Sequence, residues 1–439
     1  MAYLTATIRK HFTDTYFSRR PLSEADYSRS RNLFILEGVC ANGIFTLTSG
    51  AFLSGYVASL GADESLNGII GSIPTLLCAT QLFSSVVIEN LKQKKFLIAI
   101  MALIHRLLLA GMFFIPFFVQ GIAARITAMI IMFSVSHFCG TFIGTGAGNW
   151  ILQLLANNNV GSYLGKKDAY ALGAATLISL VMGKVLDNYR SSGAELFGFA
   201  VIGIAALAIA FTNFYCLSSI KEPASEIRRE KVNLKDVLTK PLAHKGFRKI
   251  ILFYVFWNLA LQIAGPFFSI YMVTGLKLDY FYITTVGLLS SAARVGAAII
   301  WGQMADKKSW LWVTKASIAL LGVIHFCWFF LTQESYVVLM PVLQVFSGIA
   351  WGGIAIAMFN IQYAFAPLEN RVIYVSANTS YAGICGFAAS LCGALLLKLL
   401  PDMAIGGFTG TGMQMLFAIS GILMIGCVLF IRIVLEKNR

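Results

Sequence analysis

The chain has few charged residues. Asp, Glu, Lys and Arg together make up 12% of its 439 residues, whereas about a quarter of a soluble domain is charged. Hydrophobic residues make up 58%, and the mean hydropathy is +0.75. One or two soluble cores could not bury this much apolar surface. Apolar runs of about 20 residues, the length that crosses a bilayer, accommodate it. The composition therefore predicts an all-α protein with many membrane-spanning helices.

The sequence also lacks the groupings that catalysis and cofactor binding require. Its eight cysteines fall mostly inside apolar runs without metal-ligand spacing, which favours small buried residues and no metal site. It has no paired carboxylates, no nucleophile beside a base and no phosphate-binding loop, so we expect no enzyme activity, no cofactor and no use of ATP. We attribute the net charge of +14 to loops that orient the chain in the membrane rather than to nucleic-acid binding.

The apolar runs predict twelve membrane spans in two groups of six. We place the spans at roughly 32–59, 66–89, 95–119, 123–153, 168–187, 195–217, 248–274, 280–303, 310–332, 337–364, 372–399 and 408–434. The predicted organisation is a cytoplasmic N-terminal segment at 1–31, a six-helix bundle at 32–217, a cytoplasmic linker at 218–247, a second bundle at 248–434 and a cytoplasmic tail at 435–439. No long apolar run precedes Asn32, so we expect no cleavable signal peptide.

Lys and Arg are distributed unevenly between the two sides of this topology. With the N-terminus in the cytoplasm, 26 of the 34 lie in cytoplasmic segments or at the adjoining span ends, and four, Arg125, Arg190, Lys277 and Lys398, lie in external loops or at external span ends. Loops that stay in the cytoplasm carry the excess of positive charge. The count predicts a multi-pass protein of the cell membrane, inner or plasma, with both termini in the cytoplasm. We expect it to be a monomer.

The second group of spans repeats features of the first at an offset of about 215 positions. The segment SGAFLSGY (Ser49–Tyr56) aligns with AGPFFSIY (Ala264–Tyr271). Nearby offsets pair Lys95 with Lys315, His105 with His325, Ser136 with Ser347, Asn149 with Asn360, and Tyr163 with Tyr374. Because each group has six spans, both enter from the same side. This indicates a parallel repeat related by a pseudo-two-fold axis along the membrane normal.

This pattern resembles the major facilitator superfamily over essentially the whole chain. That family carries a G-x-x-x-D-R/K motif in the loop after the second span, with a copy after the eighth. Here Gly302, Asp306 and Lys307 match the later copy, while the earlier copy is degenerate, with Ser85 and Glu89 at the Gly and Asp positions. The resemblance implies a gating latch at Asp306 and Glu89, with the glycine allowing close helix approach. A solvated charge flanking a helix is the alternative.

The resemblance also implies that the first, fourth, seventh and tenth spans line a central cavity. The fourth span carries polar residues four apart, which stay near one helical face, beside glycines at 140, 144 and 148 that suit close packing. Neutral polar groups beside Trp suit a polyhydroxylated solute. A polar face satisfied by a neighbouring helix, and a Trp buried in the core, are the alternatives. The candidate substrate-binding residues are Asn42, Thr46, His137, Thr141, Thr145, Asn149, Trp257, Asn258, Gln262, Gln344, Trp351 and Asn360.

Few charges fall within the spans, where a charged group costs a few kcal/mol. Glu37 lies about 7 Å inside the first span at 1.5 Å per residue, and we predict that it couples transport to protons. A structural ion pair with a Lys or Arg at the cytoplasmic rim is the alternative. Arg294, in the middle of the eighth span, could pair with an anionic substrate or a carboxylate. Arg106 and His105 belong to a span that the resemblance makes a scaffold, so we interpret both as structural.

These observations favour a secondary active transporter of a small polar solute, a sugar or glycoside, working by alternating access with a proton or another cation. The alternative is a proton-driven exporter of drugs or amphipathic compounds. Exporters of this family usually carry Gly-Pro in the fifth span, and the segment 168–187 has no proline. The loop motifs of the sugar-porter subgroup are missing too, so the subgroup stays open. The expected partners are a small-molecule substrate, a proton or another cation, and the lipid bilayer.

Overall fold

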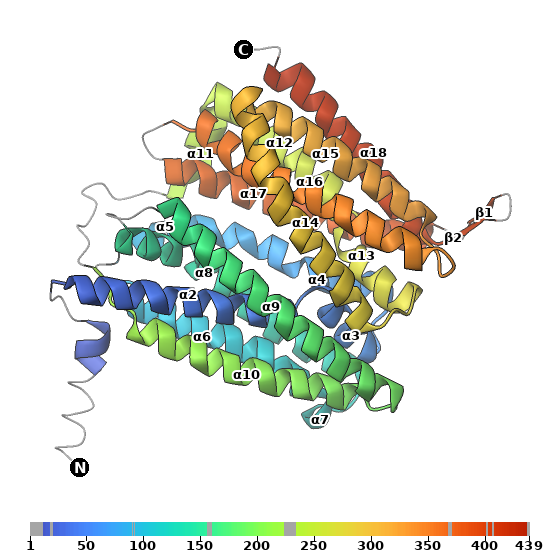
Figure 1. The fold of residues 1–439 in the computed structure, drawn as a ribbon, viewed down its shortest axis with the longest axis horizontal. Coiled ribbons are helices and arrows are strands. Elements are labelled where there is room, and N and C mark those ends of the chain that lie inside the picture. Colours follow the sequence, from blue (N-terminus) through green and yellow to red (C-terminus); the bar gives the residue numbers. More distant parts are fainter. Residues whose placement is uncertain are drawn as a thin grey trace. The chain divides into compact units, whose positions relative to one another are not determined.

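The computed structural model describes residues 12–17, 21–89, 91, 93–155, 160–223, 234–367, 371–400, 403–405 and 408–436. Most of these residues are helical, and Figure 1 labels the elements in chain order. The elements of the first half are α2 (Glu24–Leu47), α3 (Gly50–Ser59), α4 (Glu64–Leu77), η1 (Cys78–Thr80), α5 (Gln81–Glu89), α6 (Lys95–Gly111), η2 (Met112–Phe114), α7 (Ile115–Phe118), α8 (Ile122–Leu154), α9 (Val160–Ser191) and α10 (Glu195–Ser219).

The second half continues the helical pattern after a short helix in the predicted linker. Its elements are α11 (Leu234–Ala243), α12 (Lys245–Gln262), α13 (Gly265–Ile270), η3 (Tyr271–Gly275), α14 (Tyr280–Lys307), α15 (Trp310–Cys327), η4 (Trp328–Phe330), α16 (Tyr336–Phe365), α17 (Arg371–Leu399), β1 (Met403–Ile405), β2 (Phe408–Gly410), α18 (Gly412–Phe430) and η5 (Ile431–Glu436). The strands β1 and β2 form a small antiparallel hairpin, an addition to the predicted all-α fold.

The helices are long and apolar enough to cross a membrane. Within the described residues, eleven helices meet this description, and twelve do if the bent pair of α2 and α3 counts as one span. Large apolar side chains lie open on the surface, including Phe118 at 84%, Val338 at 76% and Leu399 at 76% exposure. Water would not tolerate so much exposed apolar surface, whereas lipid does. The predicted twelve-span, all-helical membrane fold is confirmed.

Local sequence sets the element boundaries that the apolar runs alone misplaced. The Ser23 hydroxyl accepts the Asp26 N–H at 3.2 Å, while the Asp26 carboxylate accepts the Ser23 N–H at 3.1 Å. This capping box starts α2 at Glu24, eight residues before the predicted span. At the other end of the chain, β2 covers 408–410, so α18 begins at Gly412 instead of 408.

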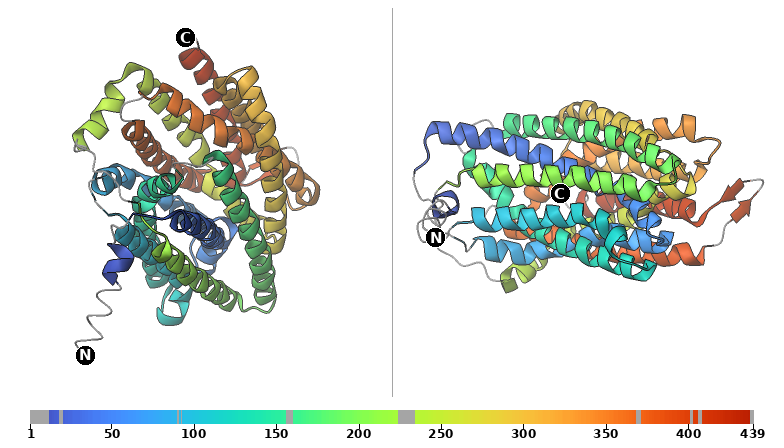
Figure 2. Two further views of the ribbon diagram at one scale, coloured as in Figure 1. Left: turned by 60° about the vertical axis from the view of Figure 1, so that its left-hand side comes forward. Right: turned by 90° about the horizontal axis from the view of Figure 1, so that it is seen from below.

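The chain packs as two compact units. The first contains residues 1–52 and 80–234, and the second contains 53–79 and 235–439. The boundary at 234 and 235 falls inside the segment predicted as a linker, while α4 and most of α3 pack with the second unit. In the first unit, the core includes Phe34 and Trp150, whose rings meet edge to face at 5.4 Å. In the second, α16 packs along α14 and α15 (Figure 2).

Two apolar helices are interrupted at related sequences. The first break separates α2 from α3 at Thr48 and Ser49, with a bend of 41°. The second separates α12 from α13 at Ile263 and Ala264. Both breaks precede the glycine of the two aligned segments, Gly50 and Gly265. Gly50 has a φ of +55°, a left-handed conformation that glycine adopts without strain.

Candidate functional site

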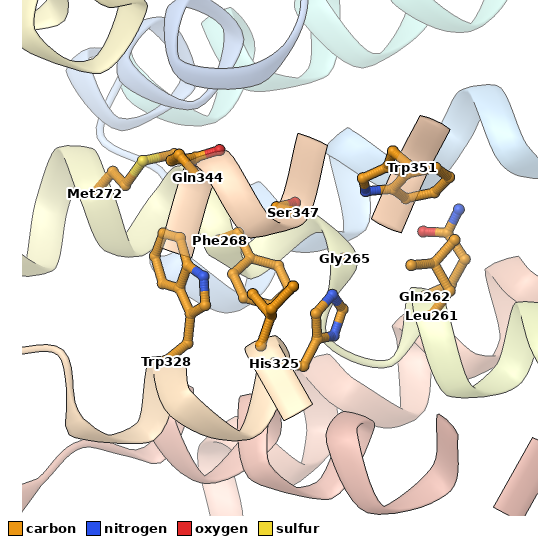
Figure 3. A pocket seen from close by; sticks show the side chains of 11 residues that line it. Leu261, Gln262, Gly265, Phe268, Met272, His325, Trp328, Gln344, Ser347 and Trp351 are labelled. Atoms are coloured by element: carbon orange, nitrogen blue, oxygen red, sulfur yellow. The ribbon is translucent and has the colours of Figure 1, made fainter. Parts of the chain in front are cut away.

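A cavity of about 320 Å³ lies inside the second unit and is enclosed by α12, α13, α15 and α16. Figure 3 shows Trp328, Phe268 and His325 on one side of this space and Gln344, Ser347 and Trp351 on the other. We call it the second-unit cavity. Its lining residues are Leu261, Gln262, Gly265, Phe268, Met272, Ile324, His325, Trp328, Gln344, Ser347 and Trp351.

The break between α12 and α13 shapes one wall of the second-unit cavity. Pro266 has no N–H, so the Gln262 carbonyl four residues earlier loses its helical donor. The Ser390 hydroxyl of α17 donates to this carbonyl at 2.9 Å instead. The chain therefore stays ordered at the break, and both Gln262 and the backbone at Gly265 border the cavity.

Aromatic rings form the floor of the second-unit cavity. The Phe268 ring meets the Trp328 ring edge to face at 4.9 Å. On its other face it stacks on Phe417 at 4.2 Å between centroids. Trp351, from α16, is held edge to face by the buried Trp257 at 6.3 Å. Edge-to-face and stacked contacts of this kind are the arrangements that aromatic pairs prefer, so each ring is held by its neighbours.

His325 adds a hydrogen-bonding group to the floor, and its neighbours determine which ring nitrogen carries the proton. Ser420 uses its single proton to donate to the Ala260 carbonyl at 2.6 Å. Its Oγ can therefore only accept from His325 Nδ1, which lies 2.9 Å away. This network assigns the Nδ1–H tautomer and leaves Nε2 as an acceptor on a residue that lines the cavity.

The remaining polar lining is neutral. Gln262 and Gln344 contribute carboxamides, and Ser347 contributes a hydroxyl. Among the described residues, no Asp, Glu, Lys or Arg lines the cavity. Carboxamides can donate and accept at once. The lining can therefore hold an uncharged molecule with several hydrogen-bonding groups and at least one apolar face.

The second unit brings together only some of the predicted substrate-binding residues. Gln262, Gln344 and Trp351 line the cavity, and Trp257 supports Trp351 from behind. Asn258 and Asn360 are outside the lining. Their side-chain amides each donate at 2.9 Å to a carbonyl of their own helix, those of Tyr254 and Ile356.

The sequence interpretation missed eight of the eleven lining residues, and four of the eight are polar or aromatic: His325, Trp328, Phe268 and Ser347. His325 lies in α15 and Trp328 in η4. Both fall in the predicted span 310–332, the ninth, for which the family resemblance implies an outer scaffold. A signal existed, because His325 and Ser347 both belong to the internal matches, with His105 and Ser136. In the first unit, His105 Nδ1 lies 2.8 Å from Ser136 Oγ, so the matched histidines both contact a serine.

The predicted substrate-binding residues of the first unit lie on α2 and α8. Thr141 donates to the His137 carbonyl at 2.8 Å and lies 2.9 Å from the Thr80 hydroxyl. The His137 ring packs edge to face on Phe133 at 4.4 Å. Asn42 donates to the Gly38 carbonyl at 3.0 Å. Thr46 and Asn149 are half-buried, and the side chain of Thr145 lies outside the described residues.

A charged cluster lies in the interior of the first unit, between α2, α6 and α10. The Arg106 guanidinium donates to the Glu37 carboxylate at 3.1 Å, with side-chain exposures of 9% and 14%. The Asn213 side-chain amide donates a hydrogen bond to the Glu37 backbone carbonyl at 3.1 Å. The sequence interpretation left Glu37 open between coupling and an ion pair. An ion pair is present, but its partner is Arg106 in the middle of the supposed scaffold helix and not a Lys or Arg at the cytoplasmic rim.

Arg294 and the motif residues occupy α14. The Arg294 side chain is exposed. Gly302, Asp306 and Lys307, predicted in a loop, form the last turns of the helix, and Asp306 and Lys307 are exposed. Among the described residues, Asp306 makes no ion pair. The side chain of Glu89 lies outside the described residues.

The glycines divide into packed and open positions. A Cβ on Gly348 would lie 2.0 Å from the Ser290 carbonyl oxygen, and one on Gly352 would lie 2.8 Å from that of Arg294, so both allow α16 to approach α14. Gly140 packs on the His105 ring in the same manner. The prediction of close approach is not met at Gly144, Gly148 and Gly302, where no atom of the described residues beyond the adjoining helix backbone lies within 4 Å of an added Cβ.

The bundle of long apolar helices with broken spans and an internal neutral cavity defines a polytopic transporter fold. Residues 35–390 match the Major Facilitator Superfamily, and the chain belongs to that family. The family and the similar solved structures are transporters, so the expectation that the chain is not an enzyme is confirmed, as is the expectation of a multi-pass membrane protein.

Solved structures show the same fold at low identity. A mutant of the nucleoside transporter NupG has a TM-score of 0.66 at 14% identity, covering 93% of this chain and 100% of that one. A D-xylose-proton symporter has a TM-score of 0.65 at 13% identity, covering 92% and 95%. A bacterial homologue of the iron transporter ferroportin, in an inward-facing state, has 0.66 at 13%, covering 94% and 99%. No curated protein sequence matches the chain.

Proposed function

We propose that the protein is a secondary active transporter of a small, uncharged polar solute, with a sugar or glycoside as the substrate class. The observation that carries this proposal is the lining of the second-unit cavity, where aromatic faces stand opposite neutral carboxamide and hydroxyl groups. The C–H face of a sugar stacks on aromatic rings while its hydroxyls bond to carboxamides. The cavity volume of about 320 Å³ lies at the lower end of ligand pockets.

The solved relatives agree with this substrate class. One carries nucleosides and another carries D-xylose. A nucleoside is an N-glycoside, so both substrates combine a polyhydroxylated ring with a neutral overall charge. A metal cation, the cargo of the iron transporter relatives, would meet a single histidine and no carboxylate in the lining, which is a poor ligand set for it.

Coupling to protons is proposed to run through Glu37. Its carboxylate is nearly buried and bonded to Arg106, so protonation would leave the guanidinium without its counter-ion and alter the packing of α2 against α6. Arg294 is the second proposed coupling group, because an exposed cation within a span can attract a carboxylate or an anionic solute. The charge count of the loops supports a cell-membrane protein with cytoplasmic termini.

Binding tests the proposed site. Sugars, nucleosides, amino acids and drugs are screened by thermal shift of the purified protein, because a ligand of the native state raises its Tm. Gln344→Leu should then weaken the best ligand tenfold or more. Asn360→Leu, on the same helix but outside the cavity, is the matched control and should leave affinity within twofold. Equal effects of the two substitutions would refute the site.

Transport tests the coupling. Glu37→Gln should abolish accumulation driven by a proton gradient in proteoliposomes and should preserve exchange of labelled for unlabelled solute. Exchange needs binding and alternating access but no proton. If the variant folds and still accumulates solute, Glu37 serves only as part of a structural ion pair.

A further inference from the structure

Gln262 connects the second-unit cavity to two other helices. Its side chain borders the cavity, and its Nε2 donates to the Thr75 hydroxyl of α4 at 3.3 Å. Its backbone carbonyl is held separately by Ser390 of α17 at 2.9 Å. The backbone anchor does not depend on the side chain. The carboxamide can therefore turn without moving the end of α12.

Thr75 is also a point of close approach between α4 and α17. A Cβ on Gly383 would lie 2.5 Å from the Thr75 carbonyl oxygen, and one on Gly386 would lie 3.0 Å from Thr75 Cγ2 and 3.1 Å from Gln262 Cγ. Two glycines thus allow α17 to fit against Thr75 and Gln262 together. Because α4, α12 and α17 are closely packed here, a change in the conformation of the Gln262 side chain alters the contact between Thr75 and α17.

Two further hydrogen bonds hold α4 and η1 to α17, and both are remote from the cavity lining. Ser65 donates to the Ala394 carbonyl at 2.8 Å. Ser380 donates to the Cys78 carbonyl at 3.2 Å. Neither involves a residue that borders the cavity. The Gln262–Thr75 hydrogen bond is therefore the one of these three that a bound solute can reach.

Resting on the proposed function, we propose that a solute in the second-unit cavity competes with Thr75 for the Gln262 carboxamide, so that binding loosens α4 from α12 and α17. At 3.3 Å the Gln262–Thr75 hydrogen bond is longer than the usual 2.9–3.0 Å, which makes its replacement by a solute acceptor favourable. A ligand shifts a conformational equilibrium only through different affinities for the two states. The Gln262 carboxamide provides this difference, because it is free to bond to the solute only in the state in which its hydrogen bond to Thr75 is broken.

The coupling works in both directions, which gives it a test. Thr75→Val keeps the shape and the methyl that faces Gly386 but removes the hydroxyl, so Gln262 is free for the solute. Thr75→Ser keeps the hydroxyl and is the matched control. D-xylose and uridine are the probes. Thr75→Val should bind a probe two- to tenfold more tightly than wild type, the range that one hydrogen bond represents, and Thr75→Ser should bind it as wild type does.

Hydrogen exchange of the α4 amides supplies the second readout. Without a probe, these amides should exchange two- to tenfold faster in Thr75→Val than in wild type or Thr75→Ser. In wild type a bound probe should accelerate the same amides, and in Thr75→Val it should add nothing further. Unchanged or weaker probe binding by Thr75→Val, or a probe that binds wild type and slows α4, would overturn the proposal.

The same design separates this proposal from the proposed function. If neither probe raises the Tm of wild type, the glycoside assignment fails for these probes. The exchange of α4 in the unliganded variants then still decides whether Thr75 holds the helix through Gln262. If Thr75→Val does not fold, the wild-type exchange with and without probe decides it alone.

Discussion

Breaking the ion pair between Glu37 and Arg106 should destabilise the protein strongly. In Glu37→Gln the Arg106 guanidinium stays protonated, with a side chain only 9% exposed. Among the described residues, its remaining hydrogen-bond partner is the Ala102 carbonyl at 3.3 Å. An uncompensated charge of this kind costs about 3–5 kcal/mol. We expect the free energy of unfolding to fall by that amount.

A double-mutant cycle separates the pair from its surroundings. Arg106→Gln should cost a similar amount, since it leaves Glu37 with the Asn213 amide at 3.4 Å as its side-chain partner. The double variant Glu37→Gln/Arg106→Gln should recover most of the loss, because replacing both charges removes the unpaired one. Denaturant unfolding of the purified protein in detergent measures all four species.

The second unit offers a matched control for this cycle. Lys315 Nζ lies 2.6 Å from the Glu436 carboxylate, but the side chains are 22% and 32% exposed. Water screens such a pair, so breaking it should cost at most about 1 kcal/mol. The reasoning is refuted if the Glu37 and Arg106 single variants each lose less than about 1 kcal/mol, or if their effects simply add in the double variant.

Two further predictions concern helix packing and pH. Gly348→Ala should lower the Tm by several degrees because its Cβ would meet the Ser290 carbonyl at 2.0 Å, whereas Gly302→Ala, in open space, should leave the Tm unchanged; equal shifts would contradict the packing. Burial raises the pKa of the Glu222 carboxyl above its ordinary 4.5, although the hydrogen bonds from the Lys94 and Lys95 N–H groups act in the opposite direction. The protonated carboxyl therefore stabilises the folded state below about pH 4.5. This stabilisation is lost as the pH rises through the raised pKa. The Tm of wild type relative to Glu222→Gln should therefore fall across that range and then level off, and a difference that grows with pH would be the contrary result.

The sequence predicted the spans well because each is an apolar run long enough to cross a bilayer. It failed at ends set by single contacts, as at Ser23, where a capping box extends α2 beyond the apolar run. It also failed for glycines: Gly348 and Gly302 look alike in sequence, and only the neighbouring helix decides that one is packed and the other is open.

The candidate site was predictable only in part for a related reason. Gln262, Gln344 and Trp351 stood out because polar and Trp residues are unusual within apolar spans. Phe268 looked like ordinary core, and nothing in the pattern shows that the break at Pro266 opens a space beside it. The partner of Glu37 depends on how α2, α6 and α10 are rotated, which a single-helix pattern does not contain.

We propose that this chain moves a neutral glycoside-like solute against its gradient with energy from an ion gradient. The most direct measurement is uptake of labelled D-xylose and uridine into proteoliposomes under an imposed inward proton or sodium gradient. Gln344→Leu and Asn360→Leu serve as the site variant and its control. We predict accumulation above the external concentration for at least one solute, collapse on adding an ionophore, loss in Gln344→Leu and retention in Asn360→Leu. Uptake no faster than into protein-free liposomes for these and other sugars and nucleosides, under either gradient, would contradict the account.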